Sequence, residues 1–369
     1  MILGAVDDRI QNLLALPKAG GSCLILLMRH LGDAVIASGI MNALHSHNPT
    51  MTVDILGRRE LRGVAASFGH FAEYIEADLP FFGHHRRNLG AMWSAFQAMR
   101  LVRRRKYDYC INVIGDFREN LIGKLAGAKW NVAPVWERGH IFKNKMTDTN
   151  ASWLANRGIK IPSFNSNYYD SLEHFAHQLG LQGLEWRGES RSSEGPNVVR
   201  SIGLHPGASH ASRRWPNDKW RLLARELNAR GYKVKVLGSP FERDGLLATF
   251  REEIASGELE VSTEDMPGLL SSLSKVDLLV GMDSFSVHAA HALNIPTIVL
   301  NGSSDPSIMT PPGGAAVSAG HLCKQFPCYY DYPCVGTEGE YVCVRGIEVE
   351  AVLKAFDSTI KNNRETGVV

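Results

Sequence analysis

The feature that most constrains the fold is a repeated alternation of short apolar segments with longer amphipathic ones. The continuous apolar run at 23–28 is typical of a strand buried on both faces. Further short strands are predicted at 109–113, 278–280 and 297–300, and helical patterns separate them. Such alternation predicts parallel sheets covered by helices on both faces. The pattern starts again near residue 198, and a chain of 369 residues is too long for one ordinary core. We therefore predict an α/β protein with two Rossmann-like domains.

The domain boundary is expected near a polar stretch at 187–197, where Gly, Ser and Pro are frequent. We predict an N-terminal domain over 1–180, a C-terminal domain over 181–345 and a closing helix within 346–369. That helix could cross the domain boundary and pack on the N-terminal domain. Ligands of doubly wound sheets bind at the carboxyl ends of the strands, so chemistry is expected in the loops that follow them.

Charge and hydropathy argue against a nucleic-acid-binding protein, a secreted protein and a transmembrane protein. The formal net charge is +2, which does not require a nucleic-acid partner. Basic clusters at 86–87 and 103–106 are either solvated helix ends or a surface for an anionic acceptor or membrane. Asp7 and Asp8 stand where a secretory signal would be basic, and no apolar stretch reaches the length of a transmembrane helix. We expect a cytoplasmic protein, either free or peripheral to the inner membrane.

The first segment that could carry chemistry runs from Arg29 through His30 to Asp33. It follows an apolar run and opens a helical pattern, with Gly32 allowing a tight turn before the acidic residue. Asp33 is then either an ordinary helix cap or a general base that takes a proton from an acceptor hydroxyl. The residues alone leave both interpretations open.

A second segment, 203–216, combines a Gly/Ser turn with Arg213 and Arg214 just before a predicted helix. Backbone N–H groups, a hydroxyl and guanidinium groups together suit a diphosphate. It is not a Walker loop, because no Gly-Lys-Ser/Thr occurs. The alternative is a surface loop whose arginines face water.

A third segment, 281–288, again joins a strand to a helix and places Asp283 and Ser284 at the junction. It is either a capped helix or a second contact for an anion and a sugar at a helix N-terminus. His288 and His291 share that helix, and we interpret them as partly buried histidines and not as a metal pair, since the sequence offers no third ligand nearby.

Four of the six cysteines, at 323, 328, 334 and 343, fall within 21 residues that also contain several Pro and Gly. Four thiolates could hold one tetrahedral zinc or iron ion, and with no open coordination position that ion would be structural. Scattered free thiols, or a disulfide under oxidation, are the alternatives. The candidate ligands are Cys323, Cys328, Cys334 and Cys343.

Taken in order, these segments resemble the heptosyltransferase family, family nine of the glycosyltransferases, from about residue 24 to residue 356. No single segment is decisive, but six in the correct order carry the resemblance. They are Leu31-Gly32-Asp33, the 205–209 turn with Arg213-Arg214-Trp215-Pro216, the 238–242 segment, Asp283-Ser284 with His288, the 302–306 segment and Cys343-Val344-Arg345-Gly346-Ile347.

This resemblance implies a GT-B fold, in which two Rossmann-like domains face a central cleft, and an inverting transfer with no cofactor for catalysis. The absence of a D-x-D tripeptide agrees with chemistry that needs no metal. Asp33 matches the family's base, and Arg213 falls where the family binds the donor phosphates. The remaining matches are Ser209 and Arg214 for phosphate, Glu242 for the nucleoside, Asp283, Ser284, Phe285 and His288 for the donor sugar, and Arg29 and His30 for the acceptor.

The expected donor is a nucleoside-diphosphate sugar, with ADP-heptose as the leading candidate. The acceptor is a lipopolysaccharide core, another glycan, a lipid-linked glycan or a protein, since the cysteine segment resembles members that glycosylate proteins and carry an iron-binding cysteine finger. Nucleic acid is not an expected partner, and the oligomeric state stays open. A nucleotide-sugar epimerase or hydrolase and a non-catalytic nucleotide-sugar-binding protein are the alternatives.

Overall fold

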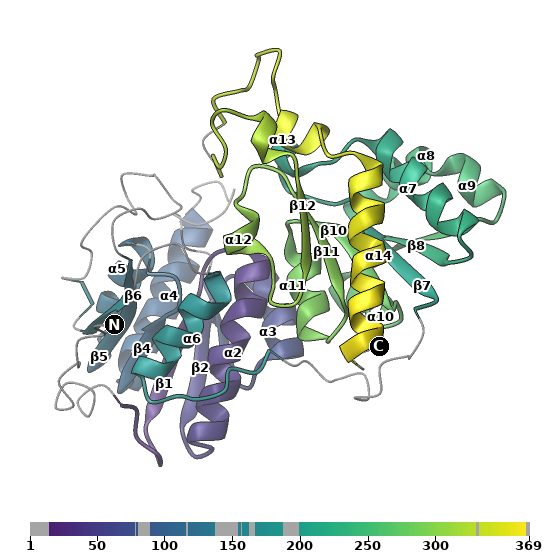
Figure 1. The fold of residues 1–369 in the computed structure, drawn as a ribbon. Helices are drawn as coiled ribbons and strands as arrows, with labels where there is room; N and C mark the ends of the chain where they lie inside the picture. The colour runs from purple at the N-terminus through teal and green to yellow at the C-terminus, as the bar shows by residue number, and fades with distance from the viewer. Residues whose placement is uncertain are drawn as a thin grey trace, which may run out of the picture. The chain divides into compact units, whose positions relative to one another are not determined.

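The computed structural model describes residues 15–77, 79, 89–115, 117–136, 154–155, 157–161, 167–186, 199–329 and 332–366. The chain divides into two compact units, Met1–Trp186 and Arg187–Val369 (Figure 1). Each unit contains one six-stranded sheet whose hydrogen-bonded strand pairs are parallel. The predicted linker at 187–197 and the basic pair at 86–87 lie outside the described residues.

The sheet of the first unit has the order β3-β2-β1-β4-β5-β6, so the direction of winding reverses between β1 and β4. The apolar run that begins at Cys23 forms β1, and its side chains are buried. The strands are β1 (Ser22–Leu27), β2 (Thr52–Gly57), β3 (Glu73–Glu76), β4 (Tyr109–Asn112), β5 (Trp130–Trp136) and β6 (Arg157–Ile161). The helices are α2 (Leu31–His47), η1 (Arg59–Leu61), α3 (Arg62–Phe68), α4 (Leu89–Arg105), α5 (Phe117–Ala126) and α6 (Tyr168–Gln178).

The second unit repeats this topology, with the order β12-β11-β10-β7-β8-β9 and a reversal between β7 and β10. The predicted class, α/β with two Rossmann-like domains, is confirmed. The strands are β7 (Ser201–His205), β8 (Lys233–Gly238), β9 (Leu259–Thr263), β10 (Leu278–Met282), β11 (Thr297–Asn301) and β12 (Ala315–Ser318). The helices are η3 (Ala211–Arg213), α7 (Asn217–Ala229), η4 (Pro240–Glu242), α8 (Arg243–Thr249), α9 (Arg251–Ala255), α10 (Met266–Leu273), α11 (Phe285–Ala292), α12 (Pro306–Met309), η5 (Gly320–Leu322), α13 (Val342–Arg345) and α14 (Val349–Thr366).

The core of the second unit includes the closing helix α14. Its residues Val352 and Phe356 belong to the same buried cluster as Trp215 and Trp220, whose rings meet edge to face at 5.0 Å. The indole N–H of Trp215 donates a hydrogen bond of 2.9 Å to the carbonyl of Ile347, just before the helix. The helix thus packs on the second sheet and on α7. Packing on the first unit stays a prediction.

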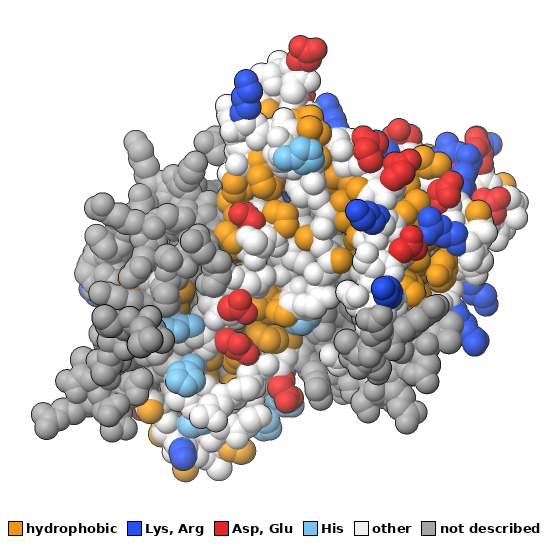
Figure 2. Space-filling model, viewed as in Figure 1, with side chains coloured by type: hydrophobic (Ala, Val, Ile, Leu, Met, Phe, Trp, Pro, Cys, Tyr) orange, Lys and Arg blue, Asp and Glu red, His pale blue; other side chains and the backbone are white. Residues whose placement is uncertain are grey.

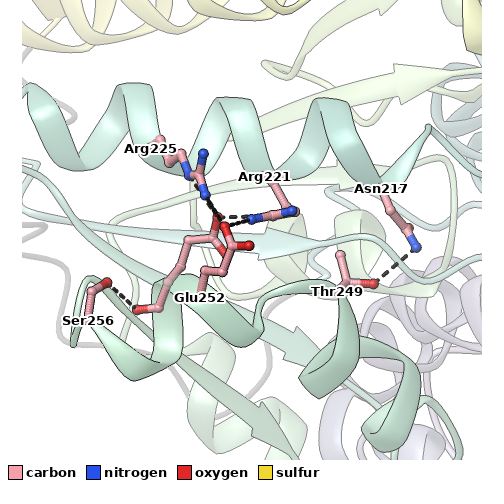
Figure 3. A network of polar contacts seen from close by, with 7 residues as sticks. Asn217, Arg221, Arg225, Thr249, Glu252 and Ser256 are labelled. Atoms are coloured by element: carbon pink, nitrogen blue, oxygen red, sulfur yellow. Dashed lines mark hydrogen bonds and ion pairs between the residues drawn. The ribbon is translucent and has the colours of Figure 1, made fainter.

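An ion-pair network on the outer side of the second unit fixes α7 against α9 (Figure 3). Arg221 and Arg225 on α7 both contact the buried carboxylate of Glu253, at 3.0 and 2.7 Å, and both also contact Glu252. On the face drawn in Figure 2, acidic and basic side chains are interspersed over this region. Since the arginines and glutamates of this network already pair with one another, we do not assign it to ligand binding.

None of the helices in the described part of the chain is both long enough and apolar enough to cross a bilayer.

Candidate functional site

The carboxyl edge of the second sheet brings Arg213 and Asp283 together. Gly281 in β10 lies beside His205 in β7, so the loops that follow these two strands leave the sheet side by side. Nη1 of Arg213 donates to the backbone carbonyl of Asp283 at 3.3 Å and lies 4.0 Å from its Oδ2. Asp283 is 2% exposed, and its Oδ2 also accepts a hydrogen bond from Ser304. A cation and a buried carboxylate therefore meet at the topological switch point, where ligands of such sheets bind.

A close approach of two loops fixes the position of this pair. A Cβ at Gly302, directly after β11, would lie only 2.1 Å from the backbone carbonyl oxygen of Ser212. The hydroxyl groups of Ser212 and Ser303 are 3.2 Å apart, and Ser303 donates to the carbonyl of Tyr329 at 3.1 Å. Only glycine lets the loop after β11 pack this closely on the loop that carries Arg213.

Glu242 lies at the same edge, beyond β8. Its Oε2 accepts hydrogen bonds from the backbone N–H and the hydroxyl of Ser239, at 2.8 and 2.7 Å. A Cβ at Gly207 would lie 2.3 Å from Oε1 of Glu242, so the carboxylate rests against the 205–209 turn. Burial lowers the pKa of His205 and so favours the neutral imidazole, although the carboxylate of Glu242 opposes that shift.

The other predicted donor-side residues are distributed around these contacts. Ser209 is exposed. Nε of Arg214 donates a hydrogen bond of 2.8 Å to the carbonyl of Ala208, within the same loop. Arg214 therefore does not join Arg213 at Asp283. Ser284 lies 3.2 Å from the hydroxyl of Ser286 at the start of α11. Phe285 is the first residue of that helix and is half-buried, and His288 is buried on it.

The two histidines of α11 fit the expectation of partly buried histidines. Burial lowers the pKa of His291 to about 4, and His288 contributes to that shift. The imidazole of His291 is therefore held as a neutral group near neutral pH.

The cysteine segment places four thiols near one another without forming a metal site. Burial raises the pKa of Cys343 to about 12, and Cys323, Cys328 and Cys334 each contribute. All four are free thiols. Across the described ranges, however, no group of three or more Cys, His, Asp or Glu side chains has the arrangement that a metal ion requires.

In the first unit, Asp33 lies in a small recess at the switch point between β1 and β4. The recess is lined by Met28 and Arg29 after β1, by Val113 after β4 and by Glu119 on α5. Oδ2 of Asp33 accepts a hydrogen bond of 3.0 Å from the backbone N–H of His30, so Asp33 does cap α2. That bond occupies only one of its two carboxylate oxygens. Capping and proton transfer are therefore compatible roles for the same side chain.

Two residues in the surroundings of Asp33 were not found from the sequence: Glu119 lines the recess, and Tyr168 interacts electrostatically with Asp33. Glu119 is fully buried, and the phenol of Tyr168, at the start of α6, has a raised pKa. Burial is the largest cause of the Tyr168 shift, the carboxylates of Asp33 and Glu119 add to it, and Arg29 opposes it. The four groups thus share one electrostatic environment. Glu119 carried no motif, because an acid in the first turn of a helix is ordinary.

Asn301, at the end of β11 in the second unit, was also missed. Its side chain is fully buried, and neither atom of its amide has a hydrogen-bond partner among the described residues. A buried amide of this kind is usually completed by an ordered water or a ligand.

Comparison with known proteins identifies the family of the chain. The sequence profile of glycosyltransferase family 9 (heptosyltransferase) matches residues 95–338, which is more than half of the chain. Lipopolysaccharide heptosyltransferase 3 of Escherichia coli is 21% identical over 299 residues, covering 75% of this chain and 82% of that protein.

Solved structures extend the likeness to the fold. The E. coli heptosyltransferase WaaC with ADP-2-deoxy-2-fluoro heptose superimposes with a TM-score of 0.67 at 15% identity, covering 91% of this chain and 99% of WaaC. The iron-containing dodecameric glycosyltransferase TibC from enterotoxigenic E. coli H10407 gives a TM-score of 0.53 at 14% identity, covering 95% and 78%. The GT-B class is thereby confirmed. The chain belongs to glycosyltransferase family 9, the heptosyltransferases, and is a glycosyltransferase.

Proposed function

We propose that the protein is an inverting transferase that moves a heptose from ADP-heptose to a hydroxyl of a lipopolysaccharide core, another glycan or a protein. Support for the donor comes from the similar heptosyltransferase that was solved with an ADP-heptose analogue. Support for the first acceptor class comes from the lipopolysaccharide heptosyltransferase relative. The observation that carries the proposal is the meeting of Arg213 with the buried Asp283 at the switch point of the second sheet.

On the donor side, Arg213 and Ser209 contact the diphosphate. The guanidinium of Arg213 donates to the carbonyl of Asp283, which holds this cation at the strand ends where the diphosphate is proposed to bind. As the bond between the anomeric carbon and the diphosphate breaks, Arg213 stabilises the charge that grows on the leaving group. Glu242 holds the nucleoside, and Ser284, Phe285 and His288 surround the sugar.

On the acceptor side, Asp33 is the general base. It takes the proton of the acceptor hydroxyl while that oxygen attacks the anomeric carbon from the face opposite the diphosphate, so the configuration inverts. Arg29 and His30, which precede the base, orient the acceptor. In this scheme Arg213 supplies the positive charge, and no metal is required.

A thermal-shift panel of ADP-, UDP-, GDP- and dTDP-sugars tests the proposed donor. A ligand at 100 times its Kd stabilises the folded protein by about 2.7 kcal/mol, so the true donor should stand out from the rest. We expect ADP-heptose to give the largest rise in melting temperature. Equal shifts with all four nucleotides would reject the donor assignment. Sugar release from the donor alone, with no acceptor present, would point to a hydrolase or epimerase.

A Gly207→Ala variant tests the role of Glu242. The new methyl group would displace the Glu242 carboxylate, because a Cβ there lies 2.3 Å from Oε1. Loss of a charged hydrogen bond to the nucleoside should weaken donor binding roughly tenfold or more. Titration calorimetry measures the Kd of each variant for ADP. Gly245→Ala, on α8, is the matched control, since nothing lies within 4 Å of its added methyl. Equal affinities in both variants would remove Glu242 from the donor site.

We also propose that the four cysteines close around one structural zinc or iron ion when metal is supplied. Burial and, after it, the three neighbouring thiols raise the pKa of Cys343, and a bound cation would lower that pKa. One of the structurally similar glycosyltransferases contains iron. Elemental analysis of freshly prepared, reduced protein should find about one metal ion per chain, and Cys343→Ser should abolish it. Metal-free protein with an unchanged melting temperature on adding zinc or ferrous iron would count against the site.

A further inference from the structure

Three large apolar side chains of α4 are exposed to solvent. Met92, Trp93 and Phe96 are 54%, 61% and 56% exposed. The rings of Trp93 and Phe96 stack on each other with their centroids 5.7 Å apart. The helix is anchored instead by its opposite side, where Ala98 and Val102 are buried. Exposed apolar side chains that lie next to one another, unlike those scattered singly, indicate a surface for a binding partner.

The second half of the same helix is strongly basic. Arg100, Arg103 and Arg104 are exposed, and none of them forms an ion pair with any residue that the structure describes. Arg105 differs, because it bonds to Asp54 and Glu73 at 2.6 Å and so serves the fold. No acidic residue occurs between 89 and 107. The helix therefore concentrates positive charge in a chain whose formal net charge is only +2.

The apolar and basic side chains share one face of α4. At about 100° per residue, Met92, Phe96, Arg100 and Arg103 follow one another along a single stripe of the helix. Trp93 and Arg104 lie beside that stripe. Aromatic rings can enter the boundary between head groups and acyl chains, and clustered arginines are attracted to anionic head groups, so an exposed face that carries both suits an anionic bilayer surface.

We infer that this face of α4 is a docking surface for an anionic lipid membrane. Trp93 and Phe96 would enter the boundary between head groups and acyl chains, while the arginines would meet the anionic head groups. A second copy of the chain is a poorer occupant, because two such faces would bring uncompensated cations together. The inference goes beyond the proposed function, since it involves none of the residues assigned to donor or acceptor.

Cosedimentation of the full chain with vesicles tests this surface. Vesicles of phosphatidylcholine with about 30% phosphatidylglycerol should bind the protein, pure phosphatidylcholine should bind it far less, and raised salt should weaken the binding. An Arg103→Gln/Arg104→Gln variant should lose about fivefold in affinity per charge, or on the order of 25-fold. Trp93→Ser/Phe96→Ser should lose roughly tenfold or more.

Matched controls come from the second unit. Leu222→Ser removes an apolar side chain of similar exposure, at 47%, and Lys233→Gln/Lys275→Gln removes two exposed cations. Both should bind vesicles like the unmodified protein, and all variants should keep its melting temperature and its affinity for ADP. Binding that is equal on neutral and anionic vesicles, or undiminished in the α4 variants, would overturn the inference. So would α4 variants that change the sedimentation coefficient of the free protein, because that result assigns the face to a protein interface.

Discussion

Asp33→Asn is expected to lower the turnover number by about 10²–10⁴-fold, the usual contribution of a general base. An asparagine has nearly the same shape, and its amide oxygen can still accept the hydrogen bond of 3.0 Å from the N–H of His30 that now caps α2. It cannot take a proton from the acceptor at neutral pH. The variant should therefore keep its melting temperature and its Kd for the donor while losing turnover.

Asp33→Ala separates the two roles of this side chain. It removes the base and the cap together, so it should lose similar activity and, in addition, about 1 kcal/mol of folding free energy. Steady-state kinetics, donor titration and thermal unfolding on both variants provide the comparison. Turnover in Asp33→Asn within a few-fold of the unmodified enzyme would leave Asp33 as a helix cap and nothing more.

The central strands could be predicted from the sequence because they are buried on both faces. β1, β10 and β11 read as continuous apolar runs, and every described position in β10 and β11 is buried. Edge strands carry no such signal. β3 (Glu-Tyr-Ile-Glu) and β9 (Leu-Glu-Val-Ser-Thr) alternate polar and apolar residues or are too short to stand out, since each has a neighbour on one side only. These strands were not identified in advance.

The candidate site also has parts that the sequence predicts and parts that it does not. The loops that follow the central strands could be located from the sequence, because strand ends and Gly/Ser turns have recognisable local patterns. The contact of Arg213 with Asp283 joins residues 70 positions apart, and only the register of β7 beside β10 brings them together. Glu119 and Asn301 lack a local pattern altogether, as a single acid in a helix and a single amide at a strand end. Their burial depends on packing that no short segment encodes.

Arg213→Ala is expected to lower the turnover number by about 10²–10³-fold, as the removal of one preorganised charge donor at a transition state does elsewhere. Charge on the diphosphate grows as the glycosidic bond breaks, so the loss should fall more on kcat than on the Kd for ADP. Arg213→Lys keeps the charge but not the planar fork, which is also anchored on the carbonyl of Asp283. Its activity should lie between those of the alanine variant and the unmodified enzyme.

The structure supplies the controls for this second experiment. Arg251→Ala removes an exposed arginine that forms no ion pair with the described residues, and it should leave kcat unchanged. Removing Arg213 also leaves the buried Asp283 with Ser304 as its remaining side-chain partner, so some stability should be lost. Rates are therefore compared well below the melting temperature of each variant. If Arg213→Ala lowers the melting temperature but leaves kcat undiminished, Arg213 is only a structural partner of Asp283. If Arg213→Ala lowers kcat and Arg213→Lys partly restores it, the positive charge of Arg213 acts on the leaving group.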